Sequence, residues 1–576
     1  MFWGALTVFA VELPPECDFW RPPQKKLIEF SWNSPTTDYL REHIREIEEK
    51  TPYQGLGLYV EAPGEWQGKK FTCTRGTIFS PIPWKYEWFA KAIDDLKNTE
   101  FHTLTDNFFR TNSCPGNIDW FSDDDMATVC NNFRIAARVA REGGLKGLSL
   151  DIEGYEAPLF IYDPDWGHSL EETRRMVRLR GRQWAEAVFG EYPNMVLFCF
   201  FWLSDAYPKY LDIGRPGDPT LTPYFINGVY DVLPPTARII DGHESMGYSA
   251  HCMENFLQIR QDLNYALRRM IDKGNVEKAL RQTQVAHAFY LDPYFINSGG
   301  WASNLEWKEH PDRAKYFVRN LRFAMECTEE YMWTWGECGS WWRSVPEKGR
   351  EKQAIGGVYS WEERTPGITA MIREAMQPVE VLEAKLKAAA VSMNSGDNLL
   401  ANSSFETSGE KNNAIPSWDF WHMKSKEYQT QWGWSKDEGI NGTGCAFLQD
   451  SASGCWIQGH DVDDGEIYYV RARAKFDEAL LTPKRLPREK NGGLFKWEVR
   501  VAPTVFIRVR WQDREKRWNN VQLDRFFTFG PPQEDGWRTA EGIVSVPANS
   551  NILSILLLCN NIKGRVLFDD VTLMRK

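Results

Sequence analysis

The sequence predicts an α/β fold, a (β/α)8 TIM barrel, followed by a C-terminal β-sandwich. Between residues 26 and 376, short apolar runs alternate at regular intervals with amphipathic helical patterns. No Gly-x-Gly-x-x-Gly turn follows any of these runs, which disfavours the alternative of a doubly wound open sheet. After Pro378 the pattern changes to short strands separated by Gly, Asn and Asp turns, as in all-β domains.

The apolar runs and the helical patterns of the first region form βα units. The strands are predicted at Lys26–Trp32, Gly55–Glu61, Phe101–Asn107, Lys146–Glu153, Met195–Leu203, Ala237–Glu244, Val285–Leu291 and Tyr331–Glu337. The helices are predicted at Thr37–Lys50, Trp84–Asn98, Met126–Glu142, Glu171–Phe189, Met253–Lys273, Arg313–Glu329 and Ile368–Ala375. Eight such units close into a barrel.

Four segments follow from these patterns: an N-terminal segment at 1–25, the barrel at 26–390, a linker at 391–397 and the sandwich at 398–576. The apolar start of the chain has the length of a signal-peptide core but lacks a preceding basic region. It fits either a remnant of a secretory signal or a segment packed on the fold. The first alternative predicts an extracellular or periplasmic protein.

Composition excludes several classes of protein. The 576 residues include 68 Lys and Arg against 79 Asp and Glu, a net charge of −11, which gives no basic footprint for nucleic acid. No apolar run is long enough to span a membrane. The eleven cysteines include no Cys-x-x-Cys zinc pattern, although Cys445 and Cys455 could pair in an exported protein. The 26 tryptophans exceed what a core needs, and a surface that stacks on sugar rings would account for the excess.

The fourth predicted strand carries the main candidate for catalysis. Because side chains alternate along a strand, Leu148, Leu150 and Ile152 share the face that packs under helices. Asp151 and Glu153 then point into the barrel, at the end of the strand where barrel active sites lie. Two buried carboxylates so close together raise one pKa and provide a proton donor near neutral pH.

Two further carboxylates end predicted strands. Glu244 ends strand six, and Glu337 ends strand eight on the same face as Trp335. Trp341 follows in the next loop. A carboxylate beside indole rings suits a sugar subsite. The remaining candidates for substrate binding lie at other strand ends: Tyr59, Glu61, Asn107, Trp202, Asp205, Asp241, His243, Tyr248 and Asp292.

Other barrel chemistries lack their motifs in this sequence. Strand one carries no His-x-His for a metal-dependent amidohydrolase, and no Gly-rich phosphate loop follows strand seven or eight. No His-Glu-x-x-His motif occurs. A hydrolase that uses carboxylate acid/base chemistry without a catalytic cofactor is what remains.

The barrel resembles glycoside hydrolases, on two motifs. Gly147–Glu153 is similar in part to the strand-four motif of family 18-type enzymes, with Lys146 and Ser149 in place of two aspartates. Trp335-Gly336-Glu337 is similar to the nucleophile strand of clan A enzymes, although Ile152 stands where that clan has Asn. The resemblance implies cleavage of a polysaccharide or oligosaccharide, most simply with retention of configuration. Glu153 would be the general acid/base, Asp151 would tune it, and Glu337 or Glu244 would be the partner. The alternative is a non-catalytic carbohydrate-binding or scaffolding protein with a degenerate barrel.

The C-terminal region opens with Asn398–Phe405 and closes with Val566–Leu573. These segments resemble family 4/9-type carbohydrate-binding modules, which are jelly rolls. The resemblance implies a structural calcium, here at Glu406 and Asp569. The aromatic candidates for a sugar platform are Trp418, Trp421, Trp432, Trp434 and Trp456, each of which could instead lie in the core.

Overall fold

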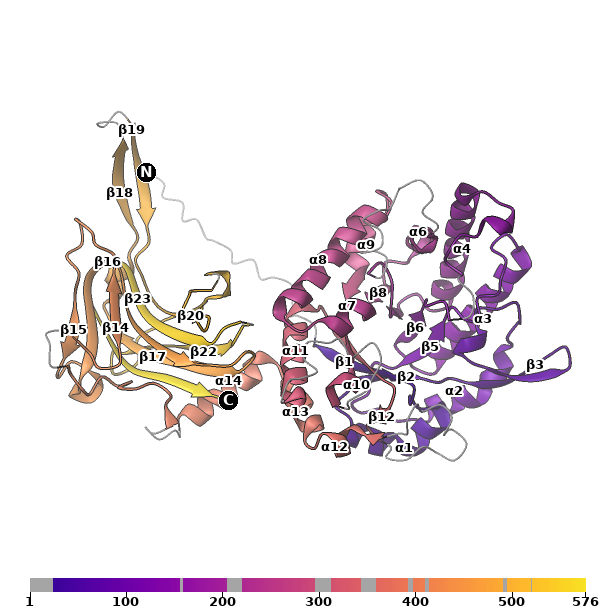
Figure 1. Ribbon diagram of the computed structural model, residues 1–576, viewed down its shortest axis with the longest axis horizontal. Helices are drawn as coiled ribbons and strands as arrows, with labels where there is room; N and C mark the ends of the chain where they lie inside the picture. Colours follow the sequence, from indigo (N-terminus) through magenta and orange to yellow (C-terminus); the bar gives the residue numbers. More distant parts are fainter. Residues whose placement is uncertain are drawn as a thin grey trace, which may run out of the picture. The chain divides into compact units, whose positions relative to one another are not determined.

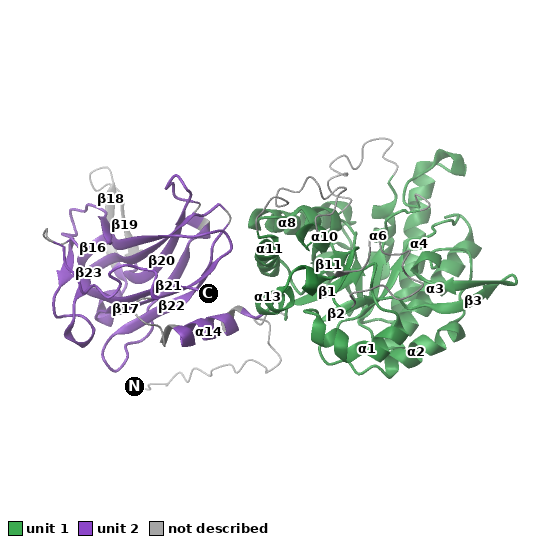
Figure 2. Ribbon diagram, turned by 60° about the horizontal axis from the view of Figure 1, so that its bottom comes forward, with its two compact units in different colours: residues 1–376 green, residues 377–576 purple. Residues whose placement is uncertain are grey.

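The computed structural model describes residues 24–155, 159–204, 220–295, 312–342, 359–391, 397–409, 414–490, 495–519, 521–547 and 549–576. The chain divides into two compact units, residues 1–376 and 377–576 (Figure 2). The first is a mixed α/β unit and the second is antiparallel β. No helix in the described ranges is long and apolar enough to cross a membrane.

A parallel sheet of nine described strands forms the centre of the first unit (Figure 1). In spatial order they are β10 (His287–Tyr290), β11 (Tyr331–Gly336), β1 (Lys26–Ser31), β2 (Gly55–Leu58), β5 (Phe108–Asn112), β6 (Gly147–Asp151), β7 (Val196–Cys199), β8 (Arg238–Asp241) and β9 (Thr283–Val285). Ala286 alone separates β9 from β10. Since β9 pairs with β8 and β10 pairs with β11, the sheet is nearly closed into a barrel.

Helices connect the strands in the order expected of βα units. They are α1 (Thr37–Lys50), α2 (Ala90–Lys97), α3 (Asp123–Glu142), α4 (Leu170–Glu191), α6 (Thr222–Val232), α8 (Met253–Met270), α9 (Val276–Gln282), α11 (Arg313–Cys327) and α13 (Ile368–Ala375). Seven of the predicted strands and all the predicted helices of this region overlap the observed elements. The sequence patterns did not reveal α6.

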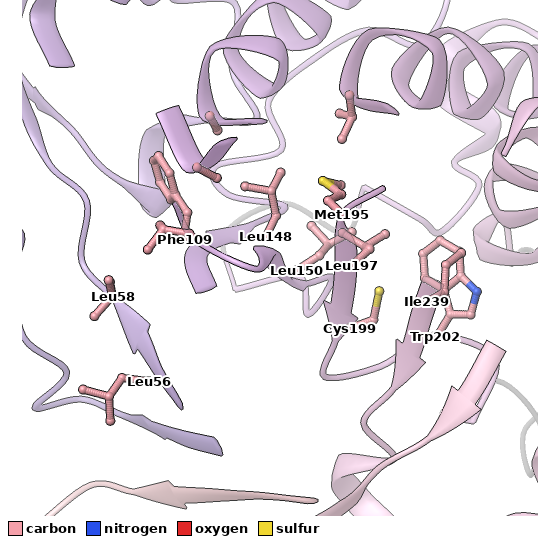
Figure 3. Close-up of a cluster of buried hydrophobic side chains, with 14 of the residues drawn as sticks. Leu56, Leu58, Phe109, Leu148, Leu150, Met195, Leu197, Cys199, Trp202 and Ile239 are labelled. Atoms are coloured by element: carbon pink, nitrogen blue, oxygen red, sulfur yellow. The ribbon is translucent and has the colours of Figure 1, made fainter. Parts of the chain in front are cut away.

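Alternation along the strands separates two apolar layers. Ile28, Phe198 and Trp333 belong to a cluster inside the sheet. Leu148 and Leu150 belong to the layer between sheet and helices, as predicted (Figure 3). The opposite face of β6 therefore points inward and ends at Asp151, at the C-terminal ends of the strands. We call this end of the sheet the barrel mouth.

The third barrel strand lies at Phe108–Asn112 and not at the predicted Phe101–Asn107. Glu48 of α1 explains the difference. Its carboxylate oxygen Oε1 accepts hydrogen bonds from the backbone N–H groups of three successive residues, 102, 103 and 104, at 2.7, 2.7 and 3.2 Å. Those groups are thus unavailable to a sheet ladder. Asn107 consequently lies at the N-terminal end of the strand, and Asn112 lies at the barrel mouth.

The second unit is an antiparallel region with its own core. Its main strands are β14 (Asp419–His422), β15 (Gln431–Ser435), β16 (Cys445–Asp461), β17 (Ile467–Lys475), β20 (Thr504–Gln512), β21 (Arg525–Thr528), β22 (Arg538–Ser545) and β23 (Ile552–Arg575). β18 (Lys484–Lys490) and β19 (Phe495–Val501) form a separate hairpin. Helix α14 (Val379–Val391) belongs to this unit, where Leu386 packs on Tyr469.

The opening and closing segments of the second unit lie side by side. Asn398 accepts a hydrogen bond from the N–H of Leu573 at 3.0 Å and donates to the carbonyl of Val571 at 2.7 Å. The asparagine side chain thus fastens the start of the unit to its last strand. This contact gives the paired sequence motifs a structural reason.

The expected pairing of Cys445 with Cys455 is wrong. Both residues lie on β16, ten positions apart, and both are free thiols. At a rise of about 3.3 Å per residue a strand keeps them far beyond the distance of a disulfide.

Candidate active site at the barrel mouth

Asp151 and Glu153 lie at the end of β6, and the carboxylate of Asp151 organises the turn that follows. Asp151 is buried, and its Oδ1 accepts from the N–H of Glu153 at 3.0 Å. Its Oδ2 accepts from the hydroxyl of Tyr155 at 3.1 Å. Burial raises the pKa of Asp151 to about 6. The two hydrogen bonds and the charge of Arg75 act in the opposite direction and make this rise smaller. Glu153 is exposed, so it can meet a ligand.

Tyr155 connects this pair with Glu244. Desolvation, followed by the charges of Asp151, Glu153 and Glu244, raises the pKa of the Tyr155 hydroxyl. Glu244 begins α7 (Glu244–Ser249), the helix that follows β8. Burial is the main cause that raises the pKa of Tyr248, and the charge of Glu244 raises it further. Three carboxylates from two parts of the sequence thus lie around two phenols.

Glu337 lies on the same mouth and is fixed by its neighbours. Its backbone N–H donates to Asp292 Oδ2 at 2.9 Å, and its Oε1 accepts from the indole of Trp335 at 3.4 Å. The ring of Tyr290 stacks on Tyr248 at 5.4 Å. Burial, then the charges of Asp292 and Glu337, raise the pKa of Tyr290. Charge interactions and one ring contact therefore connect Glu153 with Glu337 by way of Tyr155, Tyr248 and Tyr290.

Two arginines that sequence analysis missed face the barrel mouth. Arg110 of β5 lies with its guanidinium 4.6 Å from the ring centre of Tyr59 and 5.3 Å from that of Trp335. Arg75 lies 4.9 Å from the ring of Trp32. The misplaced third strand concealed Arg110, because its inward direction follows only from the correct register. Tyr59, a predicted contact, is thus brought to the site.

Two tryptophans predicted at the rim lie in the core. Trp202 is buried in the layer between sheet and helices (Figure 3), and its indole N–H donates to the hydroxyl of Tyr230 at 3.2 Å. Trp341 is buried in the same layer, edge-on to Tyr53. Neither indole has a face free for a sugar, so the structure contradicts this role for both. Both residues follow the ends of their strands, where alternation no longer gives the direction of a side chain.

Asp241 holds the backbone after β8 and β7, and His243 lies two residues further along. Buried Asp241 accepts from the N–H groups of Leu203 and Ser204 at 2.9 and 3.0 Å, and from the hydroxyl of Ser204. Burial raises its pKa to about 6. Burial also lowers the pKa of His243 to about 3, so its ring is neutral. Asp241 and His243 are 0% and 2% exposed. Contact of either residue with substrate stays a prediction.

The remaining predicted residues divide between structural and peripheral positions. Asn107 bonds the N–H of Leu56 and the carbonyl of Leu104, far from the mouth, which contradicts its predicted role. Glu61 is exposed beyond the end of β2. Asp292 positions Glu337 and Cys338 through their N–H groups. Asp205 lies outside the described residues.

In the second unit, one of the five predicted platform tryptophans is well exposed. Trp421 is 53% exposed on β14. Trp418 and Trp456 are buried in the core, and Trp432 and Trp434 pack against it. Trp421 lies opposite Cys455 in the ladder, Cys455 lies opposite Leu558, and that residue lies opposite Phe506. Phe506 contacts exposed Phe526, so one sheet face carries aromatic groups at both edges.

Glu406 and Asp569 lie close together beside the last strand. The two oxygens of Asp569 accept from the N–H groups of Ile440 and Asp570 at 2.8 and 2.7 Å. Burial, followed by the charges of Asp570 and Glu406, raises the pKa of Asp569 to about 6. A cation bound between the two carboxylates would relieve this repulsion. Within the described ranges, no three His, Cys, Asp or Glu side chains are arranged around a common metal position.

No protein-family model and no curated protein matches the sequence. Among solved structures, it is similar to a tailspike protein 4 domain of bacteriophage CBA120 (12% identity, 31% of this chain and 22% of that one, TM-score 0.22). It is similar to the CBM22-1–GH10 modules of a Clostridium thermocellum endo-1,4-beta-D-xylanase (18% identity, 31% of this chain and 28% of that one, TM-score 0.22). It is also similar to the CBM22-1 xylan-binding domain of Paenibacillus barcinonensis Xyn10C (12% identity, 30% of this chain and 91% of that one, TM-score 0.19). The chain thus spans less than a third of the first two structures. At these TM-scores the similarities carry no argument about fold or function.

Proposed function

We propose that the protein is a glycoside hydrolase that cleaves a polysaccharide or oligosaccharide at the barrel mouth. The observation that carries the proposal is the group of Asp151, Glu153, Glu244 and Glu337, linked by charge interactions with three tyrosines at the C-terminal ends of parallel strands. Barrel enzymes place their catalytic groups at these ends. We also propose that β9 and β10 are halves of one strand, so that the sheet is an eight-stranded (β/α)8 barrel.

In this proposal each carboxylate has a separate role. Exposed Glu153 is the general acid/base, oriented through its N–H by Asp151. Glu337 is the nucleophile, because the indole of Trp335 and the anchored backbone fix its position. Glu244 orients Tyr248. Such a pair gives a covalent intermediate and retention, which requires carboxylates about 5–5.5 Å apart.

The test is the release of reducing ends from a panel of polysaccharides. Glu153→Gln and Glu337→Gln should each lower turnover by about 10²-fold or more, since each removes a proton-transfer or attacking group. Glu186→Gln on the exposed side of α4 is the matched control and should keep full activity. Activity of either mouth variant within a few-fold of wild type, with the circular dichroism spectrum unchanged, would reject the assignment.

The same panel separates the hydrolase from a protein that only binds carbohydrate. Retention of the wild type on a polysaccharide gel without release of reducing ends would favour binding alone. If sugar is released, proton NMR of the first anomer formed distinguishes retention from inversion.

For the second unit we propose a jelly-roll carbohydrate-binding module with a structural calcium at Glu406 and Asp569. The exposed aromatic groups Trp421 and Phe526 support sugar binding. The repulsion between buried Asp569 and the nearby Glu406 supports the calcium. A chelator should lower the melting temperature of this unit, and the Glu406→Gln variant should lose that response. An identical melting curve with and without chelator would count against the metal.

A further inference from the structure

One side of the barrel mouth, from β11 through β1, β2 and β5 to β6, carries a pair of arginines set among aromatic rings. Arg110 is 3% exposed. Its guanidinium lies over Tyr59 and Trp335, and that of Arg75 lies over Trp32, with Trp32 and Trp335 edge-to-face at 5.6 Å. Weakly hydrated guanidinium groups suit such stacking, and the stacking holds them rigidly.

Among the described residues, no Asp or Glu oxygen lies within 4.0 Å of a nitrogen of either guanidinium, so neither arginine forms an ion pair. Arg110 donates to two neutral oxygens, the carbonyl of Ser31 and, at 3.1 Å, the hydroxyl of Ser34. Asp151 already accepts from Glu153 and Tyr155. The charges of buried Glu29 and Asp151 act on Arg110 without forming an ion pair with it. Elsewhere in this unit, buried Arg180 is paired with Asp123 at 2.8 Å.

The arginine pair lies beside both proposed catalytic carboxylates. The charge of Arg75 acts on Asp151, and the charges of Arg75 and Asp151 both act on Arg110. Trp335, under Arg110, donates to Glu337 at 3.4 Å. A ligand group held by the arginines would therefore be close to the bond that Glu153 and Glu337 are proposed to act on.

The geometry points to a substrate whose sugar unit carries an anionic group, a uronic-acid carboxylate or a sulfate ester, held by Arg75 and Arg110. This inference rests on the proposed function for its sugar. The planar fork of a guanidinium donates two parallel hydrogen bonds to either anion. The aromatic rings of Trp32, Tyr59 and Trp335 are placed to contact the apolar face of the same unit.

The test is a calorimetric titration with three galacto-oligosaccharides of matched length: neutral, galacturonate and sulfated. The wild type should bind at least one anionic form more tightly than the neutral form, and the two anionic arms identify which group is recognised. Arg75→Gln should weaken that binding about 10- to 100-fold and weaken neutral binding much less. Arg269→Gln is the matched control, because Arg269 is an exposed arginine that stacks on Tyr265.

Two results would overturn the inference. One is equal affinity of the wild type for the neutral and anionic oligosaccharides, which includes binding of none of them. The other is an equal effect of Arg75→Gln on the affinity for all three oligosaccharides. Circular dichroism checks that the variant is folded. Binding does not require cleavage, so the two proposals fail separately. Arg75-dependent anion binding without sugar release rejects the hydrolase alone, and cleavage of neutral glycans with no preference for the anionic forms rejects the anionic substrate alone.

Discussion

At the scale of single residues, Asp151 connects the fold to the proposed chemistry. Its two oxygens orient the backbone of Glu153 and the hydroxyl of Tyr155. Its pKa of about 6 lies above the ordinary 3.8 because the side chain is buried. Folding therefore favours the protonated carboxyl. Its stabilising contribution is full below the unfolded pKa and is lost as the pH rises through about 6.

Asp151→Asn should remove this part of the pH dependence, because an amide does not titrate. Between pH 4 and pH 7 the free energy of unfolding of the wild type should fall relative to the variant by up to about 3 kcal/mol. Urea unfolding at both pH values measures this. Exposed Asp165→Asn is the control and should follow the wild type. Parallel pH curves for wild type and Asp151→Asn would contradict the expectation.

Sequence reasoning identified the carboxylates of the mouth but not its arginines. Alternation on a correctly located strand gave Asp151 its direction. Arg110 was missed because its strand begins seven residues later than predicted. Nothing local distinguishes residues 101–107 from a strand, since it is the distant carboxylate of Glu48 that occupies their N–H groups.

At the scale of elements, helices α4 and α6 cross where each presents a glycine to the other. A Cβ on Gly181 would lie 2.2 Å from the carbonyl oxygen of Phe225, and one on Gly228 would lie 2.0 Å from that of Arg178. The close approach thus depends on both glycines. Helix α6 escaped prediction, and seven of its eleven residues are buried.

Gly228→Ala should force α4 and α6 apart and lower the free energy of unfolding by about 1–3 kcal/mol. Gly190→Ala is the matched control on α4, because no atom lies within 4 Å of its added Cβ. That variant should be unchanged or stabilised by up to about 1 kcal/mol through higher helix propensity. Urea denaturation compares the two, and equal stability of both variants would refute the crossing argument.

At the scale of the molecule, the division between units falls before α14, and the predicted linker at 391–397 falls after it. In α14, Leu386 packs on Tyr469 and Lys387 pairs with Glu541 at 2.8 Å. A fragment of residues 377–576 should therefore be more stable than one of 398–576, by about 2 kcal/mol for the buried leucine.

Thermal unfolding of the two fragments tests this, with Val381→Ala in the longer fragment as a control, since that side chain is 42% exposed. The control should melt with its parent. If the fragments melt together, the helix contributes nothing and the shorter boundary describes the folding unit.

The tryptophan content shows what composition conveys about the whole chain. Many of the tryptophans are fully buried: Trp84, Trp120, Trp184, Trp202, Trp333, Trp341, Trp361, Trp456 and Trp511. Trp32, Trp335 and Trp421 lie at the candidate sugar sites. An indole serves either purpose, so their number could not separate the two.

The sequence by itself determined the order of strands and helices, the direction of Asp151 and the change to an antiparallel second unit. These follow from local periodicity, which the sequence contains. Only the tertiary structure decided which groups meet: Arg110 with Trp335, Tyr248 with Tyr290, and Asp241 with Ser204. Those contacts join residues from different strands, helices and loops, and their distances depend on strand register and sheet closure, which no local pattern specifies.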